Sequence, residues 1–318
     1  MGRPTGLEPA TPRFTILCSN QLSYDRRKEP VNLASRSGTV NPFLRLCRCP
    51  SAGGFQAEGG PIQSVRLLTF NIAHARGLNP IQGLTSQRKL RLNLRKIARL
   101  LDVLKPDIVA LQEIDERSRW AGNFDHLEYL RLHAGFPHAV FGINNRRKGL
   151  LNLSYGNAFL SRHPIVATET VVFGQRSVGE KGFLFAEFDV GGRLVPVVNL
   201  HLHFSSREHR IRQLGRLLAW LREKQRARRT HWQVPPIICG DFNNPGTSPD
   251  ATAALLSHLS DYHDYSLHPV RGRTFPSPLP SWLLDFVFLP PACLRARSEV
   301  VRAMLSDHRP VLVDFDLA

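Results

Sequence analysis

From Val65 onward, short apolar runs alternate with segments of helical periodicity, and this alternation restricts the chain to folds built from layers of sheets and helices. The runs VRLLTFN (65–71) and DIVALQE (107–113) are typical of buried strands. Further strands are expected at YGNAFLS (155–161), PIVATETVVF (164–173), FLFAEFDV (183–190), LVPVVNLHL (194–202), PPIICGD (235–241), WLLDFVFL (282–289) and RPVLVDFDL (309–317).

Three amphipathic helices are expected between these runs. The first begins after Ser86, which can cap it, and ends before Pro106. Its apolar face consists of Leu90, Leu94, Ile97, Leu101 and Leu104, at steps of three and four residues. The second covers residues 123–136. The third covers roughly 206–227, with Ile211, Leu214, Leu218 and Leu221 facing inward.

Residues 1–60 differ from the rest of the chain. They show neither helical nor strand periodicity and are rich in Pro, Gly, Ser and Arg. We therefore expect them to form a disordered or non-native N-terminal extension. Residues 61–318 are expected to form the folded domain, since 42% apolar residues in a chain of 318 can bury a sizeable core.

The chain is strongly basic, with a formal charge of +16. Residues 1–60 carry eight Lys or Arg and four Asp or Glu, so residues 61–318 still hold a charge of +12. Such a charge attracts polyanions, nucleic acid among them, although dispersed Arg residues can equally be solvated. The five cysteines do not suggest a disulfide framework. A reducing, cytoplasmic location is expected, and no apolar window is long enough for a membrane span.

Polar side chains stand at the ends of six predicted strands. They are Asn71, Glu113, His201, Asp241 with Asn243, Asp285, and Asp307 with His308. Strand ends can meet at one rim of a sheet sandwich, where a rigid scaffold fixes their geometry. Taken singly, Asp241 could cap a turn, Glu113 could pair with Arg117, and His201 could be an ordinary buried histidine. Occurring together at six strand ends, they favour a shared site.

A cluster of partly buried carboxylates is costly without a cation. Each ionised group loses hydration worth several kcal/mol, and the charges repel one another. Asp, Glu and Asn provide oxygen ligands. Such a donor set suits a hard ion, Mg²⁺ or Mn²⁺, better than zinc. Asp241 is therefore expected to face a metal-bearing phosphate site.

These residues resemble the endonuclease/exonuclease/phosphatase superfamily with the DNase-I-like fold. The motifs that carry the resemblance occur in order: TFN at Asn71, LQE at Glu113, YGNAFLSRHPI at 155–165, NLHL at His201, GDFN at 240–243, LDFVF at Asp285 and SDHRPV at 306–311. The resemblance covers Val65 to the C-terminus. It implies a four-layer α/β/β/α sandwich, in the α+β class, with two mixed β-sheets flanked by helices and the active site on one rim.

The resemblance also implies a role for each motif residue. Asn71, Glu113 and Asp307 would bind the divalent metal. Asp241 and Asn243 would orient or deprotonate the attacking water, while His201 and His308, the latter polarised by Asp285, would hold the scissile phosphate. Tyr155 and Asn157 would contact the substrate.

Two positions depart from the family pattern. DNA-repair members carry Lys two residues after the metal-binding Glu, whereas this chain has Asp115 at that position. An abasic-site endonuclease activity is therefore less favoured. Leu283 occupies a position where many members carry Arg, so one phosphate or base contact is missing or supplied elsewhere. Candidate substitutes are the basic segment NNRRKG (144–149), read as a loop, and the aromatic residues Trp120, Phe275 and Trp282, which could stack on a base or sit against a lipid. An ordinary solvated turn is the favoured interpretation of the loop, and core or rim packing that of the aromatic residues.

The favoured interpretation is a monomeric, divalent-metal-dependent phosphodiester hydrolase that acts on nucleic acid. One alternative is a sphingomyelinase-like enzyme acting on phospholipid or phosphoinositide headgroups. Another is a non-catalytic binding module, because a fold alone never secures activity. No motif carboxylate is missing, and this favours an enzyme.

Overall fold

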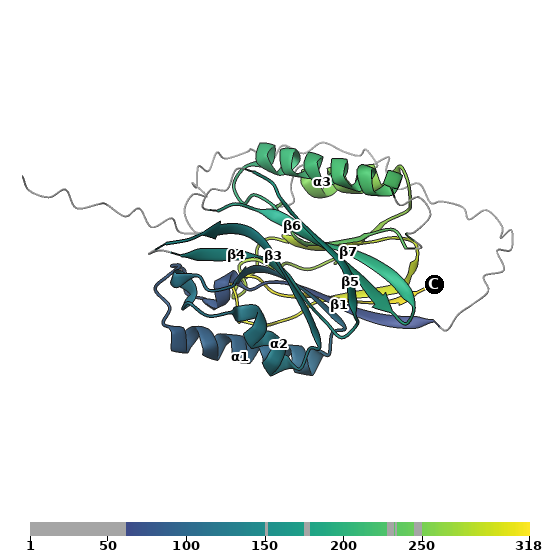
Figure 1. Ribbon diagram of the computed structural model, residues 1–318. Coiled ribbons are helices and arrows are strands. Elements are labelled where there is room, and N and C mark those ends of the chain that lie inside the picture. Colours follow the sequence, from purple (N-terminus) through teal and green to yellow (C-terminus); the bar gives the residue numbers. More distant parts are fainter. Residues whose placement is uncertain (1–61, 150–151, 175–178, 228–231, 233, 245–249) are drawn as a thin grey trace, which may run out of the picture.

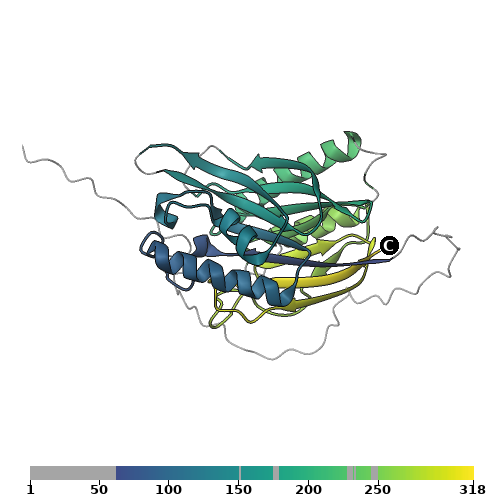
Figure 2. The same cartoon turned by 60° about the horizontal axis from the view of Figure 1, so that its bottom comes forward.

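The protein is a four-layer sandwich, seen edge-on in Figure 1 and turned by 60° in Figure 2. The computed structural model describes residues 62–149, 152–174, 179–227, 232, 234–244 and 250–318. Two six-stranded mixed sheets pack face to face, with helices covering both outer faces. The expected fold class is confirmed. The expected N-terminal extension at 1–60 lies outside the described residues.

The first sheet has the strand order β11-β12-β1-β2-β4-β3. Its strands are β1 (Gln63–Asn71), β2 (Ile108–Asp115), β3 (His138–Arg147), β4 (Leu153–Ser161), β11 (Cys293–Val300) and β12 (Val311–Leu317). Only the β1–β2 pair of this sheet is parallel within the described chain.

The second sheet has the order β5-β6-β7-β8-β10-β9. Its strands are β5 (Ile165–Val172), β6 (Gly182–Val190), β7 (Arg193–His201), β8 (Ile237–Asp241), β9 (Ser266–His268) and β10 (Asp285–Leu289). Here β7 and β8 form the parallel pair, so each sheet is built around two parallel central strands.

Helices α1 (Gln87–Leu104) and α2 (His126–Ala134) cover the first sheet, while α3 (Arg207–Ala227) and α4 (Ala251–Ser260) cover the second. Ser86 caps α1 as expected, because its side chain accepts the Lys89 backbone N–H. Of the residues expected to face inward from α3, Leu214 and Leu221 are buried, whereas Ile211 and Leu218 are half-buried. Within the described residues, no helix is long and apolar enough to cross a membrane.

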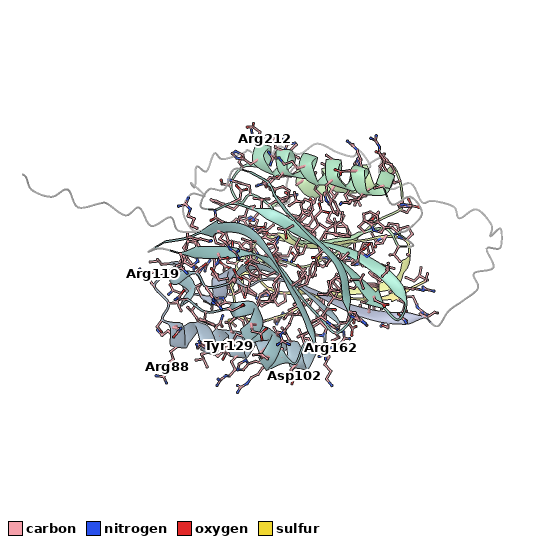
Figure 3. The ribbon with its side chains drawn as sticks, viewed as in Figure 1. Arg88, Asp102, Arg119, Tyr129, Arg162 and Arg212 are labelled. Atoms are coloured by element: carbon pink, nitrogen blue, oxygen red, sulfur yellow. The ribbon has the colours of Figure 1, made fainter. Side chains whose placement is uncertain are left out.

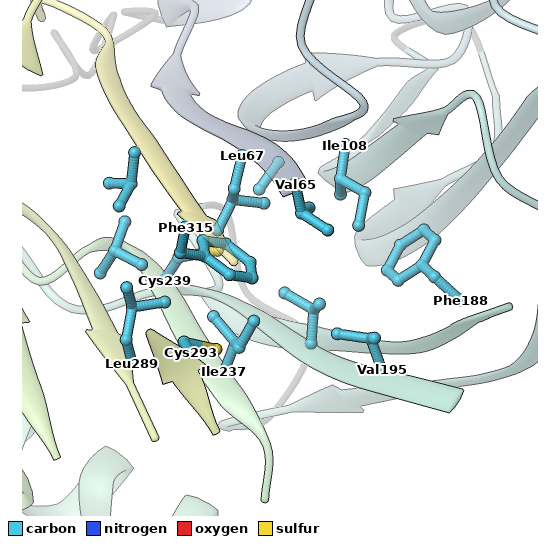
Figure 4. Packing of buried hydrophobic residues seen from close by; sticks show 14 of the residues in the cluster. Val65, Leu67, Ile108, Phe188, Val195, Ile237, Cys239, Leu289, Cys293 and Phe315 are labelled. Carbon is cyan, nitrogen blue, oxygen red and sulfur yellow. The ribbon is translucent and has the colours of Figure 1, made fainter. Parts of the chain in front are cut away.

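Three apolar clusters separate the four layers. The central one lies between the sheets and joins β1 and β2 of the first sheet to β6, β7, β8 and β10 of the second (Figure 4). It includes Val65, Phe188 and Cys239, each with no exposed surface. The outer clusters pack α1 and α2, or α3 and α4, against their sheets. Strands buried on both faces explain the continuous apolar runs in the sequence.

Some elements were not expected from the sequence. Strands β3, β9 and β11 and helix α4 were missed, and the segment read as a basic loop at 144–149 begins inside β3. In β11 the exposed positions alternate with half-buried ones and carry Arg and Glu, so the strand lacks an apolar run. Its pairing with β12 decides its conformation.

Gly240 should be essential to the packing of β8. Its backbone has φ +137°, and a Cβ there would clash with the carbonyl oxygen of Leu200 on β7. We expect Gly240→Ala to lower the free energy of unfolding by about 1–3 kcal/mol, the usual cost of overpacking. Gly215→Ala in α3 is the matched control, because a Cβ there meets open space, and it should stabilise by about 0.5–1 kcal/mol. Urea denaturation of both variants checks this; equal effects would contradict it.

Candidate active site

The sheet topology brings the polar strand ends to one rim. Because β7 and β8 are parallel, His201 and Asp241 pair side by side at their carboxyl ends. Strand β10 runs antiparallel to β8 and begins at Asp285, directly opposite Asp241. A strand that ends and an antiparallel neighbour that begins thus contribute side chains to the same edge.

The first sheet supplies the other half of the rim in the same way. Strands β1 and β2 are parallel and end at Asn71 and just beyond Glu113. The segment before β12 approaches the end of β1, where Ser306 Oγ donates a hydrogen bond to the Asn71 carbonyl at 2.7 Å. The two halves are joined by a hydrogen bond from Asn71 Nδ2 to Asp241 Oδ2 at 2.9 Å. The convergence expected from the sequence is therefore present.

Glu113 occupies an irregular position in β2. The register against β4 shifts between Leu111 and Ile114, and Glu113 has φ +52°. Such bulges redirect a side chain and occur next to active sites, and a left-handed non-glycine residue costs free energy that the surrounding structure must offset. The bulge aims the Glu113 carboxylate into the rim. Periodicity in the sequence gives no sign of it.

Three cationic or ionisable groups surround Glu113. Lys181 Nζ lies 3.3 Å from Oε1, His74 Nε2 lies 3.5 Å from Oε2, and His201 Nε2 lies 3.8 Å from Oε1. Burial by itself would raise the pKa of Glu113, but the charges of Lys181 and His74 outweigh it, so the pKa is lowered well below its usual range. Glu113 is therefore ionised, and its buried Oε2 accepts no hydrogen bond.

His308 sits between two carboxylates. Its Nδ1 lies 2.9 Å from Asp285 Oδ2, and its Nε2 lies 3.6 Å from Asp241 Oδ2. Burial lowers the pKa of His308, but Asp285 and Asp241 more than compensate and raise it to about 10. The ring is thus an imidazolium held by Asp285, with Nε2 unpartnered and available to a phosphate oxygen. The expected contact of His308 with the scissile phosphate stays a prediction.

Asp241 is a fully buried acid of the rim. Burial raises its pKa to about 7, against the opposing charge of His308. Its Oδ1 accepts the backbone N–H of Asn243 at 2.9 Å, and the Asn243 side chain donates to the Leu202 carbonyl at 2.9 Å. Asn243 therefore orients Asp241 through its backbone. A carboxyl group that titrates near neutrality is suited to accept a proton from water.

Asp307 shares a counter-ion with Glu113. Arg76 Nη2 donates to Asp307 Oδ2 at 2.6 Å, and the charge of Arg76 also contributes to the lowered pKa of Glu113. Two of the expected metal ligands, Glu113 on β2 and Asp307 in the segment before β12, therefore belong to one charge cluster. Arg76 itself was not anticipated from the sequence.

Lys181 was also missed. It immediately precedes β6, whose first residue, Gly182, pairs with His201. Lys181 Nζ contacts His201 Nε2 at 2.9 Å as well as Glu113. Burial and the Lys181 charge lower the pKa of His201 well below its usual value, so this ring is neutral. Lys181 thus places a cation beside Glu113, although Asp115 stands where DNA-repair members carry Lys. The run GEKGF before a predicted strand was the available signal.

A second His–Asp pair supports Glu113. His74 Nδ1 lies 2.7 Å from Asp115 Oδ2, and Trp120 Nε1 donates to Asp115 Oδ1 at 2.9 Å. His74 belongs to the short turn η1 (Ala73–Ala75), in which all three residues have positive φ. Such a run is costly for L-residues, and here it presents His74 to Glu113. Trp120, one of the candidate substrate contacts, is engaged with Asp115 through its indole N–H.

The two expected substrate contacts differ in position. Tyr155 lies on β4 opposite Asp115, and its hydroxyl accepts the Gly179 backbone N–H at 2.7 Å. Asn157 is fully buried and donates to the backbone carbonyls of Gly182 and Asn199, thereby bridging the sheets. Substrate contact by either residue stays a prediction.

The residues at the Glu113 end fit a hard divalent cation. Glu113 Oε2 is buried, charged and without a hydrogen-bond donor, and Asn71 and Asp307 add oxygen donors. The cluster of Asp241, Asp285 and His308 also brings three ligand atoms within 4.8 Å of one another. Both imidazole nitrogens of His308 face carboxylates of this cluster, so we favour the Glu113 end for the metal.

The His308 imidazolium should stabilise the metal-free protein in a pH-dependent way. Its folded pKa, about 10, exceeds the ordinary value of 6.5, so its contribution is complete below about pH 6.5 and is lost as the pH rises toward 10. We expect the difference in unfolding free energy between wild type and His308→Asn to shrink over that window. Urea denaturation in EDTA measures this, and a difference that grows with pH would contradict it.

The His74–Asp115 pair should affect metal binding. We expect Asp115→Asn to weaken Mn²⁺ binding about 10- to 100-fold, because His74 loses the acceptor that orients it toward Glu113. Asp125→Asn makes the same chemical change at the cap of α2 and should leave the affinity unaltered. Titration calorimetry of both variants is the measurement. Unchanged affinity in Asp115→Asn would refute the supporting role.

Comparison with known proteins gives consistent matches. A model of the Endonuclease/Exonuclease/phosphatase family matches residues 68–308. Sphingomyelin phosphodiesterase 5 from Danio rerio is 26% identical over 270 residues, which cover 77% of this chain and 50% of that protein. The chain therefore spans about half the length of that curated relative.

Solved structures share the fold at lower identity. Sphingomyelinase C from Streptomyces griseocarneus has 22% identity and a TM-score of 0.57, over 79% of this chain and 99% of that one. TDP2 from Caenorhabditis elegans, in a truncated form, has 18% identity and a TM-score of 0.54, over 80% of this chain and 98% of that one. These likenesses support the sandwich fold.

Proposed function

Because the chain belongs to the endonuclease/exonuclease/phosphatase family of hydrolytic phosphoesterases, we propose that it is a divalent-metal-dependent phosphodiester hydrolase acting on nucleic acid. The observation that supports this most directly is the division of the rim into two ends. One end holds Glu113 with an unpartnered carboxylate oxygen, and the other holds Asp241 beside the His308 imidazolium. Metal binding and water activation are thus assigned to different acids.

The chain's own residues account for the steps that need a protein group. Asp241, with a pKa near neutrality, accepts the proton of the attacking water, while Asn71 and Asn243 fix its orientation. His308 Nε2 faces the space beside Asp241 and donates to the phosphate oxygens, where negative charge develops.

Glu113, with Asn71 and Asp307, would hold Mg²⁺ or Mn²⁺. A bound divalent ion supplies Lewis-acid stabilisation of the phosphoryl charge. Such stabilisation is needed because a general base contributes only about 10² to 10⁴ in rate.

Nucleic acid is favoured by charge on the rim. The β3–β4 hairpin ends beside the site, since Asp115 pairs with Tyr155 and Tyr155 with Asn145. Past the Tyr155–Asn145 pair, a cavity of about 390 Å³ is lined by four basic residues, Arg117, Arg146, Arg147 and Lys148. Arg146 forms an ion pair with Glu116. Basic side chains next to a phosphodiesterase site suit a polyanionic backbone.

A sphingomyelinase-like activity is the second candidate. The names of the Danio rerio relative and the Streptomyces griseocarneus structure favour it. A compact headgroup contacts few cations, so its binding would vary little with salt. We also propose a monomeric cytoplasmic enzyme; the buried free thiols of Cys239 and Cys293 are compatible with a reducing compartment.

A substrate panel tests this function. Plasmid, single-stranded DNA, RNA, sphingomyelin and inositol phosphates are incubated with Mn²⁺, and bis-p-nitrophenyl phosphate reports hydrolysis in general. We expect hydrolysis of nucleic acid, with a KM that rises steeply with salt. Hydrolysis of sphingomyelin alone would support the second candidate. No metal-stimulated hydrolysis of any substrate would indicate a non-catalytic module.

Asp241→Asn is the variant for the same panel. We expect its turnover to fall by about 10² to 10⁴, the usual contribution of a general base. Its fold should persist because the amide has the same shape and its one oxygen can still accept the Asn243 backbone N–H, although the bond from Asn71 is lost. Circular dichroism controls for folding, and near-normal metal-dependent turnover in this variant would refute the role of Asp241.

A further inference from the structure

A basic cavity of about 470 Å³ borders the candidate active site. Its walls come from the end of β5, the segment before β6, the segment after β7 and one face of α3. Its volume lies within the range of small-molecule binding sites. Of its lining residues, only Lys181 also contacts the site residues Glu113 and His201 among the contacts described above.

Lys181 connects the cavity to the catalytic centre. The side chain lines the cavity, and its Nζ also contacts Glu113 and His201. A group bound in the cavity would therefore be a close neighbour of the scissile phosphate. The two sites would be occupied by adjacent parts of one substrate.

The cavity is predominantly cationic. Lys181, Arg212 and Arg216 line it, against Glu180 as the one carboxylate among its described lining residues. Arg216 Nη1 donates to the Phe173 carbonyl, which fixes the guanidinium in the wall. Arg212 is largely exposed and lies 3.9 Å from Glu208, a distance at which an exposed pair contributes little. The charge of Arg212 is thus available to an anion.

The segment after β7 is held firmly in place. The His203 backbone N–H donates to Gln213 Oε1 at 2.8 Å, and Arg210 Nη1 donates to the His203 carbonyl at 3.1 Å. Arg210 is itself buried and paired with Asp250. His203 Nδ1 accepts the backbone N–H of Ser206 at 3.3 Å, so a neutral ring carries its proton on Nε2. The cavity wall is therefore preorganised.

An aromatic pair lines the same cavity. The rings of His203 and Phe204 are nearly parallel, at 9° with centroids 5.2 Å apart, and Phe204 is 40% exposed. An exposed flat ring beside cations is the combination with which proteins hold single nucleotides, through base stacking and phosphate contacts.

We propose that this cavity binds the nucleotide adjacent to the scissile phosphodiester, with its phosphate on Arg212 and Arg216 and its base on the Phe204–His203 pair. The proposal rests on the proposed function and specifies the substrate as a strand with a second phosphate next to the cleaved one. A choline headgroup is disfavoured, because a quaternary ammonium is attracted by aromatic faces but repelled by neighbouring cations.

Binding of short oligonucleotides without metal tests the proposal. Titration calorimetry in EDTA compares the dinucleotide TpT with pTpT and TpTp, so the added phosphate probes either side of the diester. We expect one of the two terminal phosphates, and not the other, to tighten binding about 10-fold, as charged hydrogen bonds do. Arg212→Ala should remove most of this gain. Phe204→Ala should weaken the binding of all three oligonucleotides about 5-fold or more.

The control is Arg88→Ala. Arg88 lies on α1, in the opposite outer layer from Arg212 on α3 (Figure 3). The Arg88→Ala variant should keep the full gain in affinity from the terminal phosphate. If Arg88→Ala and Arg212→Ala lost this gain equally, the gain would reflect only a general charge effect, and the proposal would be overturned. No advantage at either end would overturn it too. Tighter, Arg212-dependent binding of inositol trisphosphate would reassign the cavity to a headgroup.

These outcomes are distinct from failure of the proposed function. The binding assay needs neither metal nor turnover, whereas the substrate panel needs both. Hydrolysis of nucleic acid without an Arg212-dependent phosphate preference would overturn the subsite alone. Absence of nucleic-acid hydrolysis from the panel would overturn the function on which the subsite rests.

Discussion

The hydrogen bond between Asn71 and Asp241 joins the two sheets at the rim where the charged side chains meet. Below it, Gln112 Nε2 donates to Asn199 Oδ1 across the same interface at 2.7 Å, and Asn157 donates to two carbonyls of the second sheet. Apolar packing between sheets has no direction, whereas hydrogen bonds do. This polar layer therefore fixes how one sheet is placed on the other, and the site depends on that placement.

The rim gathers buried acids and balances them internally. Glu113 is surrounded by Lys181 and His74, Asp307 is paired with Arg76, and Asp285 with Asp241 holds His308. Breaking such pairs is costly because the remaining charge stays buried. The family match confirms the predicted enzyme class, a hydrolytic phosphoesterase. Glu113 Oε2 and His308 Nε2 are among the buried rim atoms without a hydrogen-bond partner, and we assign the proposed metal and phosphate functions to them.

Much of this arrangement could be predicted from the sequence, because continuous apolar runs mark strands buried on both faces and polar residues border six of the predicted strands. Asp241, Asp285 and His308 were found in this way and do converge. Lys181 and Arg76 were missed because each stands in a connection without periodicity. His74 was missed for the same reason, since its backbone geometry comes from three consecutive left-handed residues that no local pattern in the sequence reveals.

The sequence by itself determined the layered class, most of the buried strands and the polar residues that border them, because these follow from local periodicity and side-chain chemistry. Only the tertiary structure decided which charges are neighbours. The bulge at Glu113, the approach of Lys181 and the basic cavity beneath α3 arise from contacts between residues that are far apart in the chain. Burial and distance set electrostatic energies, and both exist only once the two sheets have packed together.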